Sequence, residues 1–297
     1  MHGLKLPRKV RRVSLGAVGA RIAWEDPITD GLVYLWLPTQ YPSITPIFSG
    51  IGSPGTANLK QTLQSPLVTQ IGGVAFGGGS AGGGVFSANT SGSEALVIPA
   101  AKGSLAMFLA ASFSPTDSVA HYCFDISPGS GTPEFSFTKF SDNNWYFGWD
   151  NASDTRASGS AAGTFTAGKP FVAGGTWNSS HTLFYSDGLL RITKAASPST
   201  FATNGRNLGI GIYPSAGGSN PWCTSTSDGM HWLAIWSREL GADEWRRLAE
   251  DPCCLIRWPQ DDLGILSGPH VAPSFTWLQM DLLSAASVNQ KTDVIGY

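Results

Sequence analysis

Short apolar and aromatic runs, each bounded by turn residues, recur along the sequence and limit its fold more than any other feature. Clear examples are Gly31–Leu37, Ala120–Ile126 and Phe171–Trp177. The turn signal Ser186–Gly188 then leads into Leu189–Thr193. Runs of this length, about 8–15 residues apart with Gly, Pro, Asn and Asp between them, are typical of antiparallel β-sandwiches. The spacing predicts an all-β, two-sheet antiparallel sandwich.

The remaining runs extend this interpretation over most of the chain. Trp145, Phe147 and Trp149 alternate along one strand and share a face, which favours the core over the surface. Asn58–Thr69 is polar and is expected to be irregular. Further strands are expected at Gly73–Phe76, Val85–Ser87, Ala95–Ile98, Ser104–Phe113, Glu134–Phe140, Thr182–Ser186, Asn207–Ile212 and His231–Trp236.

One segment has helical rather than strand spacing. Leu240, Trp245 and Leu248 form an apolar stripe, and the pattern predicts a short surface helix over Ala242–Glu250. Acidic residues in its first turn and basic residues in its last complement the helix dipole, and Pro252 ends it.

Charge is scarce and unevenly distributed. Charged residues make up 13% of the 297-residue chain, where soluble domains average about 25%. Six of the 19 basic residues lie in the first 21 positions without an acid, which leaves 13 basic against 21 acidic residues elsewhere, a net of −8. A basic arm on an acidic body is suited to assembly, and the alternative is a solvated tail. The predicted assembly residues are Lys5, Arg8, Lys9, Arg11 and Arg12.

Neither export nor a cysteine framework is expected. Arg21 interrupts the weakly apolar run Ser14–Ala23, and no run approaches the length of a membrane helix. The cysteines lack zinc-ligand spacing and are expected as buried free thiols. A single bridge from Cys223 to Cys253 or Cys254 stays open.

Several motifs, taken in order, resemble laminin-G/concanavalin-A-like domains of the type found in bacteriophage structural proteins. Three of these motifs lie upstream: the opening strand Gly31–Trp36, the strand pair Gly73–Phe86, and the hairpin from Gly175–Trp177 to Tyr185–Gly188. The others follow one another near the end: the strand His231–Trp236, the turn Ser237–Leu240, the helix, and the ending Asp251–Pro259. The resemblance implies a jelly-roll sandwich over residues 31–259, with a basic arm at 1–30 and an extension at 260–297.

Residues for catalysis or metal binding are not found in the patterns that such chemistry needs. Related hydrolases carry Glu-x-Asp-x-x-Glu on one strand, and none of the six Glu residues lies in that pattern. Gly78–Gly82 matches a nucleophile elbow but lacks a following helix. The five histidines are expected as surface or hydrogen-bonded core residues. Asp142–Asn144 and Asp150/Asp154 are interpreted as polar turns, so no cofactor is expected and a calcium site is not supported.

Exposed aromatic residues offer a surface for sugars. Trp222 lies in the polar loop Ser215–Ser227, and with Asn220 and Tyr213 it is the predicted ligand-binding site. Other candidates for a stacking platform, with the core as the favoured alternative, are Trp145, Tyr146, Trp149, Trp177, Tyr185, Trp232 and Trp236.

The sequence thus predicts a non-enzymatic virion protein of a bacteriophage, a capsid decoration, head-fibre or tail component. Its expected partners are other virion proteins and further copies of itself, with a cell-surface glycan as a further candidate, and neither a membrane nor a specific nucleic acid. Its expected location is the virion, assembled in the host cytoplasm. The alternative is a carbohydrate-binding lectin-type module, and a glycoside hydrolase ranks third.

Overall fold

The structure is a computed structural model that describes residues 21–36, 101–127, 134–150, 156–195, 206–211 and 228–257. It also describes short pieces at 48–49, 60–62, 67–68, 74–75, 84–90 and 98–99. The chain divides into two units at Gly264, and all of the second, Ile265–Tyr297, lies outside the described residues. The predicted arm residues Lys5–Arg12 lie outside them as well.

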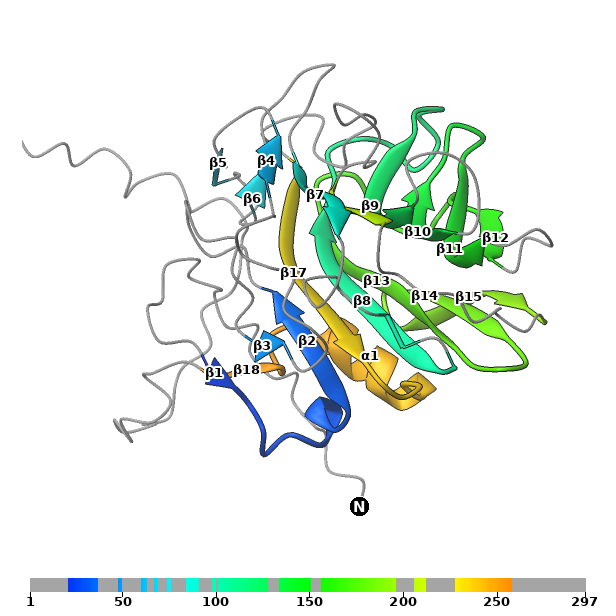
Figure 1. Ribbon diagram of the computed structural model, residues 1–297. Coiled ribbons are helices and arrows are strands. Elements are labelled where there is room, and N and C mark those ends of the chain that lie inside the picture. Colours follow the sequence, from blue (N-terminus) through cyan, green and yellow to red (C-terminus); the bar gives the residue numbers. More distant parts are fainter. Residues whose placement is uncertain are drawn as a thin grey trace, which may run out of the picture. The chain divides into compact units, whose positions relative to one another are not determined.

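Two antiparallel sheets pack face to face, which confirms the predicted sandwich (Figure 1). One sheet has the order β12 (Ala157–Ser160), β11 (Asn144–Asp150), β10 (Glu134–Lys139), β9 (His121–Ser127), β16 (Arg206–Ile210), β7 (Gly84–Thr90) and β4 (Lys60–Thr62). The other has the order β15 (Leu189–Lys194), β14 (Thr182–Ser186), β13 (Pro170–Trp177), β8 (Gly103–Ala110), β17 (Gly229–Trp236), β2 (Leu32–Trp36) and β3 (Phe48–Ser49). In addition, β6 (Val74–Ala75) pairs with β17, and β5 (Leu67–Val68) pairs with β6. We call them the seven-stranded and the nine-stranded sheet.

The core between the sheets is strongly aromatic. Trp145, Phe147 and Trp149 of β11 are fully buried, which confirms their expected face. Phe135 of β10 meets Trp149 edge-on, with ring centroids 4.8 Å apart. Trp145 also donates a hydrogen bond to Thr164 Oγ1 at 2.8 Å, so its indole nitrogen is paired inside the core. Paired and edge-packed rings of this kind combine a large buried apolar area with one preferred packing.

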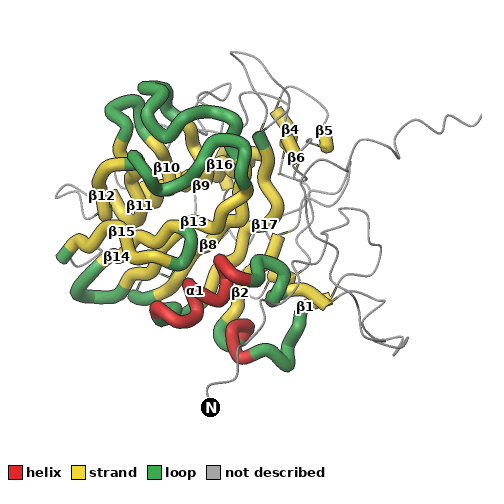
Figure 2. The backbone as a smooth tube through the Cα atoms, turned by 180° about the vertical axis from the view of Figure 1, so that it is seen from behind, coloured by secondary structure: helices red, strands yellow, loops and turns green. Residues whose placement is uncertain are grey.

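A second hydrophobic layer covers the outer face of the nine-stranded sheet (Figure 2). Helix α1 spans Ala242–Glu250, as the sequence predicts, and buries Trp245 and Leu248. The Trp245 ring stacks on Tyr185 of β14, with centroids 4.9 Å apart and planes 6° from parallel. The short pair β1 (Arg21–Ile22) and β18 (Ile256–Arg257) joins this layer. Because both faces of β8 and β17 are covered, every residue of these strands is buried.

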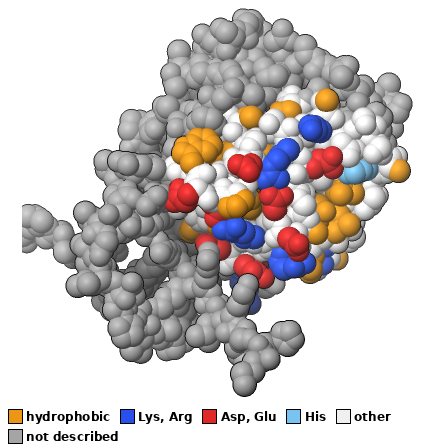
Figure 3. Space-filling view, turned by 90° about the horizontal axis from the view of Figure 1, so that it is seen from below, with side chains coloured by type: hydrophobic (Ala, Val, Ile, Leu, Met, Phe, Trp, Pro, Cys, Tyr) orange, Lys and Arg blue, Asp and Glu red, His pale blue; other side chains and the backbone are white. Residues whose placement is uncertain are grey.

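Arg238 holds the segment Ser237–Leu240, which links β17 to α1 and which we call the closing motif. Its guanidinium donates to both carboxylate oxygens of Glu244, at 2.8 and 2.6 Å, and to the backbone oxygen of Asp30 at 2.6 Å. Glu244 in turn accepts from the backbone of Gly241 at 2.8 Å, which caps α1. The underside of the view in Figure 1, where α1 lies, carries acidic and basic side chains side by side (Figure 3).

Several sequence expectations were wrong. The segment expected to be irregular, Asn58–Thr69, contains β4 and β5, and Ile98 lies outside any strand. Strands β1, β3, β12 and β18 were not expected, because two-residue bridges and the small residues of β12 carry no apolar alternation. At Gly159 of β12, a side chain would meet Ile192 of β15 at 3.0 Å, so close approach of the two sheets requires a small residue there.

Buried cysteine and histidine residues complete the comparison with the sequence. Cys123, Cys253 and Cys254 are buried, as expected, and no disulfide joins them to one another, while Cys223 lies outside the described residues. His231 was expected to be exposed or hydrogen-bonded. Instead it is 4% exposed, and neither ring nitrogen has a hydrogen-bond partner in the described part of the chain. No helix among the described residues is long and apolar enough to cross a membrane.

Candidate functional site

The outer face of the seven-stranded sheet presents polar side chains in two cross-strand rows. Alternate residues of a strand point to opposite faces, so the core aromatics leave their neighbours on the outer face. The first row consists of Tyr122, Thr138, Tyr146 and Ser158. The second row consists of Gly209, Asp125, Ser136 and Gly148. The second row is buried, whereas the first becomes half-buried at Tyr146 and exposed at Ser158.

An aromatic group borders the first row where β10 turns into β11. Phe140 directly follows β10, and 40% of it is exposed. Its ring meets those of Tyr122 and Tyr146 at centroid separations of 6.4 and 5.9 Å, both at 76°. Edge-to-face contacts on two sides hold the Phe140 ring in one orientation. We call this edge of the sheet, formed by Phe140, Tyr122 and Tyr146, the Phe140 rim. It offers a fixed apolar surface to solvent.

Asp142 places an ionised carboxylate beside this ring. It accepts hydrogen bonds from the Tyr146 hydroxyl at 2.7 Å and from the side chain and backbone of Asn144 at 3.0 Å each. Partial burial alone would raise the pKa of Asp142, but these hydrogen bonds outweigh it and hold the pKa below its usual value. Asp142 is consequently charged at neutral pH, and its hydrogen bond also raises the pKa of Tyr146.

Arg156 is a cation on the same face, and its charge is compensated by an ion pair with a neighbouring carboxylate. One guanidinium nitrogen lies 2.9 Å from a carboxylate oxygen of Asp150, and another donates to Ser136 Oγ at 3.3 Å. The guanidinium carbon also lies 4.9 Å from the centre of the Tyr146 ring. The ion pair and the cation–π contact fix Arg156 against the sheet.

A buried ion pair attaches the loop before β9 to the rim. The Lys139 side chain is fully buried, donates to the Asp117 carboxylate, and also donates to the backbone oxygen of Val119 at 3.0 Å. Asp117 pairs with His121 Nε2 at 2.7 Å as well. Burial would raise the pKa of Asp117, but the hydrogen bonds from Lys139 and His121 hold it below its usual value. The pair therefore keeps Lys139 from interacting with a ligand.

Two further hydrogen bonds connect the same loop to the β10–β11 turn. Ser118 donates its backbone N–H to Asn143 Oδ1 at 2.8 Å, and Asn143 Nδ2 donates to Ser118 Oγ at 3.1 Å. Both residues have positive φ, 58° and 62°, which asparagine tolerates better than most residues. This connection places Val119, 47% exposed, on the same rim as Phe140.

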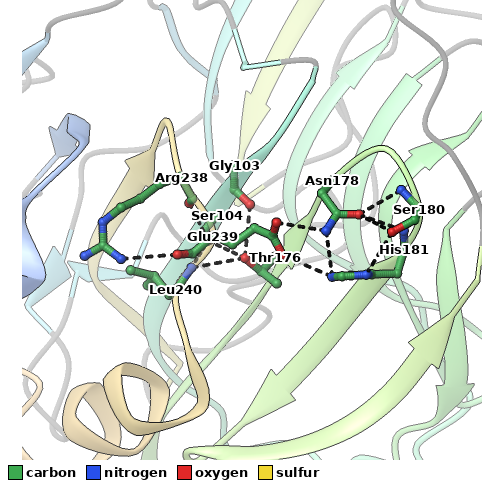
Figure 4. Close-up of polar contacts among 9 residues, drawn as sticks. All are labelled: Gly103, Ser104, Thr176, Asn178, Ser180, His181, Arg238, Glu239 and Leu240. Carbon is green, nitrogen blue, oxygen red and sulfur yellow. Dashed lines mark hydrogen bonds and ion pairs between the residues drawn. The ribbon is translucent and has the colours of Figure 1, made fainter.

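A second polar cluster lies where the β13–β14 turn meets the segment before α1 (Figure 4). Glu239 accepts from Asn178 Nδ2 at 2.8 Å, and its other oxygen lies 3.0 Å from His181 Nε2. Ser180 Oγ lies 3.4 Å from His181 Nδ1, so the three residues follow the order of a Ser–His–acid relay. The Ser180 hydroxyl, however, donates to Asn178 Oδ1 at 2.9 Å, and the cluster fastens the turn.

In the same region, hydrogen bonds link the β13–β14 hairpin to the closing motif. Thr176 Oγ1 and Ser104 Oγ, both buried, accept hydrogen bonds from the backbone N–H of Leu240 at 3.2 and 2.9 Å (Figure 4). Buried backbone groups need such partners. Thr176 of the hairpin therefore accepts a hydrogen bond from the backbone N–H of Leu240 in the closing motif.

Metal ligands do not converge in the described residues, where no group of three or more His, Cys, Asp or Glu is placed to hold an ion. The oxygens of Asp142 accept hydrogen bonds within their own turn, and Asn143 Oδ1 accepts one from Ser118. This use of the oxygens fits the interpretation of the segment as a polar turn.

The predicted ligand residues and the observed rim do not overlap. Tyr213, Asn220 and Trp222 lie outside the described residues. Of the other platform candidates only Tyr146 reaches the surface, and the rest are buried: Trp145, Trp149, Trp177, Tyr185, Trp232 and Trp236. Alternation along β11 could have singled out Tyr146, because it faces away from the three core aromatics. The role of Phe140 depends on the folded turn, and sequence reasoning missed it.

Comparisons with known proteins were made for the sequence and for the structure. No protein-family model and no curated protein matches this sequence. Solved structures do match its fold. The structure of HCR/D-Sa-GBL1/C is 15% identical and covers 75% of this chain and 52% of its own, with a TM-score of 0.53.

Two further structures match at lower TM-scores. Domain 4 of AbnA, an extracellular arabinanase from Geobacillus stearothermophilus solved with arabinotriose, is 13% identical, covers 73% of this chain and 98% of its own, and has a TM-score of 0.46. A sialidase from Trypanosoma rangeli is 14% identical and covers 80% of this chain and 34% of its own, at 0.48. This chain thus spans about half of the HCR/D protein and about a third of the sialidase. At such identities the likeness concerns the fold alone, which is a two-sheet antiparallel β-sandwich of the jelly-roll type.

Proposed function

We propose that this protein is a carbohydrate-binding module of the lectin type, and that it binds sugar at the Phe140 rim without catalysing a reaction. The observation that carries the proposal is the exposed Phe140 ring, fixed edge-on by Tyr122 and Tyr146. Sugar rings have apolar faces of C–H groups that pack on such a surface. Asp142 and Asn144 beside it supply acceptors and donors for hydroxyl groups.

The apolar contact also sets the size of the expected effect. An aromatic side chain contributes about 200 Å² when buried, so covering the exposed 40% of Phe140 removes about 80 Å² from water. At about 25 cal/mol per Å² this is worth about 2 kcal/mol, or more than tenfold in affinity.

A glycan array, followed by titration of the best ligand, tests the proposal. Phe140→Ala should weaken binding about tenfold or more while the variant remains folded at the temperature of the assay. The control is Leu189→Ala, which removes an even more exposed apolar side chain, 57% exposed, from β15 of the other sheet. Equal binding by both variants, or no binding of any glycan by the unmodified protein, would refute the proposed function.

A second candidate function, the assembly of phage virions, is favoured by the charge asymmetry of the sequence. The first 21 residues contain six basic and no acidic residues, while the remaining residues carry a net negative charge. The phage assignment rests on sequence motifs alone. Since Arg21 pairs with Arg257 in the β1–β18 bridge, a clean test deletes Met1–Ala20 and leaves the bridge intact. Loss of particle incorporation with an unchanged melting temperature would support assembly, and full incorporation would count against it.

A further inference from the structure

The charges on the rim and on the loops around it indicate which sugars the site accepts. Residues 111–168, which include β9 to β12, contain two basic against six acidic side chains, a net of −4. The acids are Asp117, Asp125, Glu134, Asp142, Asp150 and Asp154. The two cations are Lys139 and Arg156.

Neither cation is available to an anionic ligand. Lys139 has no exposed side-chain surface and pairs with Asp117. Arg156 is 18% exposed and pairs with Asp150 at 2.9 Å. To pair with either cation, the carboxylate of a ligand would have to displace Asp117 or Asp150. The displaced side chain would then be a partly buried negative charge without its ion-pair partner.

Three of the segments that connect to this sheet along the chain bring no further charge of either sign. The other basic residues within its strands are Lys60 of β4 and Arg206 of β16, and Arg206 precedes Asn207, which pairs with Ser127 at the end of β9 away from His121. Segments 128–133, 195–205 and 212–227 contain no Asp, Glu, Lys or Arg. The nearest exposed charge to Phe140 along the chain is Asp142, two residues away, which hydrogen bonds keep ionised. The exposed charge beside the Phe140 ring is therefore that of a carboxylate.

We propose that the Phe140 rim selects uncharged sugars, and that Asp142 is the residue that excludes carboxylated ones such as sialic acids and uronic acids. This inference rests on the proposed function and specifies its ligand class. Two like charges about 4 Å apart repel enough, even with the dielectric constant of water, to weaken binding about fivefold. Asp142 also accepts a hydrogen bond from Tyr146, so its carboxylate cannot turn away without losing that bond.

The test compares pairs of array glycans that have the same neutral core and differ only by a terminal sialic acid. The unmodified protein should bind the neutral member at least about fivefold more tightly, and high salt should narrow the difference. Asp142→Asn keeps the shape and an acceptor oxygen, and it should reduce the preference to about twofold or less. The control Asp243→Asn removes a carboxylate that is 90% exposed on α1 and should leave the preference unchanged.

The outcomes separate this inference from the proposed function. Binding that sialylation leaves equal or strengthens overturns the charge selection while the sugar-binding function stands. A preference that persists in Asp142→Asn overturns the role of Asp142, and Asp142→Glu, which retains the charge, should keep the preference if the role is electrostatic. Absence of any glycan binding by the unmodified protein overturns both proposals.

Discussion

Replacing His231 should reduce the acid sensitivity of this fold. His231 occupies the irregularity where β17 shifts register against β8, and its ring stacks on Phe108 with centroids 4.2 Å apart. Only 4% of the residue is exposed, and neither ring nitrogen has a partner among the described residues. Burial lowers the pKa of His231 from 6.5 to about 3.

The direction and size of the effect follow from proton binding. Between about pH 6.5 and pH 3, an unfolded chain carries a proton on this histidine and the folded chain does not, so the unfolded state binds more protons. Stability must then rise with pH across this window and fall on acidification. The two pKa values give a loss of about 2 kcal/mol from pH 7 to pH 5 and about 3 kcal/mol by pH 4.

Urea unfolding at pH 7, 5 and 4 measures this loss directly. His231→Leu should be at least as stable as the unmodified protein at pH 7, because it removes buried polar atoms that lack partners. Its stability should fall less on acidification, by about 2 kcal/mol at pH 5. Carboxylates with lowered pKa contribute equally to both proteins and cancel in the difference. Parallel curves, or a His231 ring that titrates near pH 6 by NMR, would refute the reasoning.

Three other predictions concern the contact between Arg238 and Glu244, the buried ion pair of Lys139 and Asp117, and the thiol of Cys254. Arg238→Leu should cost about 2–3 kcal/mol in urea unfolding, because Glu244 loses both of its guanidinium bonds, and Arg238→Lys should recover part of the loss. Asp117→Asn should cost about 3–5 kcal/mol by the same assay, because it leaves buried Lys139 uncompensated. Cys254 should resist alkylation in the folded protein at pH 8, because burial raises its pKa to about 12, and rapid modification would contradict this.

The sequence predicted those parts of the fold whose local signals agree with their tertiary surroundings. Helix α1 matches its predicted bounds because its apolar stripe, acidic first turn and Pro252 all indicate the same segment. The facing of Trp145, Phe147 and Trp149 matches because these three apolar rings alternate with Tyr146, Gly148 and Asp150, which leaves little choice of face.

Other features depend on contacts between distant residues and could not be predicted in this way. Strand β12 is recognisable only from its partners, because Gly159 is small to admit Ile192 from the other sheet. His231 looks like an ordinary strand residue until the register shift buries it. Phe140 resembles the core phenylalanines of β10, and only the turn after Lys139 brings it to the surface.

Coverage of the nine-stranded sheet explains why a ligand surface is expected on the other sheet. Helix α1 and the β1–β18 bridge contribute to the hydrophobic layer that covers the outer face of β8 and β17. A ligand that binds there would have to displace Trp245, whose burial is worth about 3–5 kcal/mol. On the seven-stranded sheet, by contrast, the Phe140 rim is already exposed, and binding costs no unfolding of the core. For the proposed sugar ligand, Phe140 therefore offers an exposed ring that can be covered without displacing a buried residue.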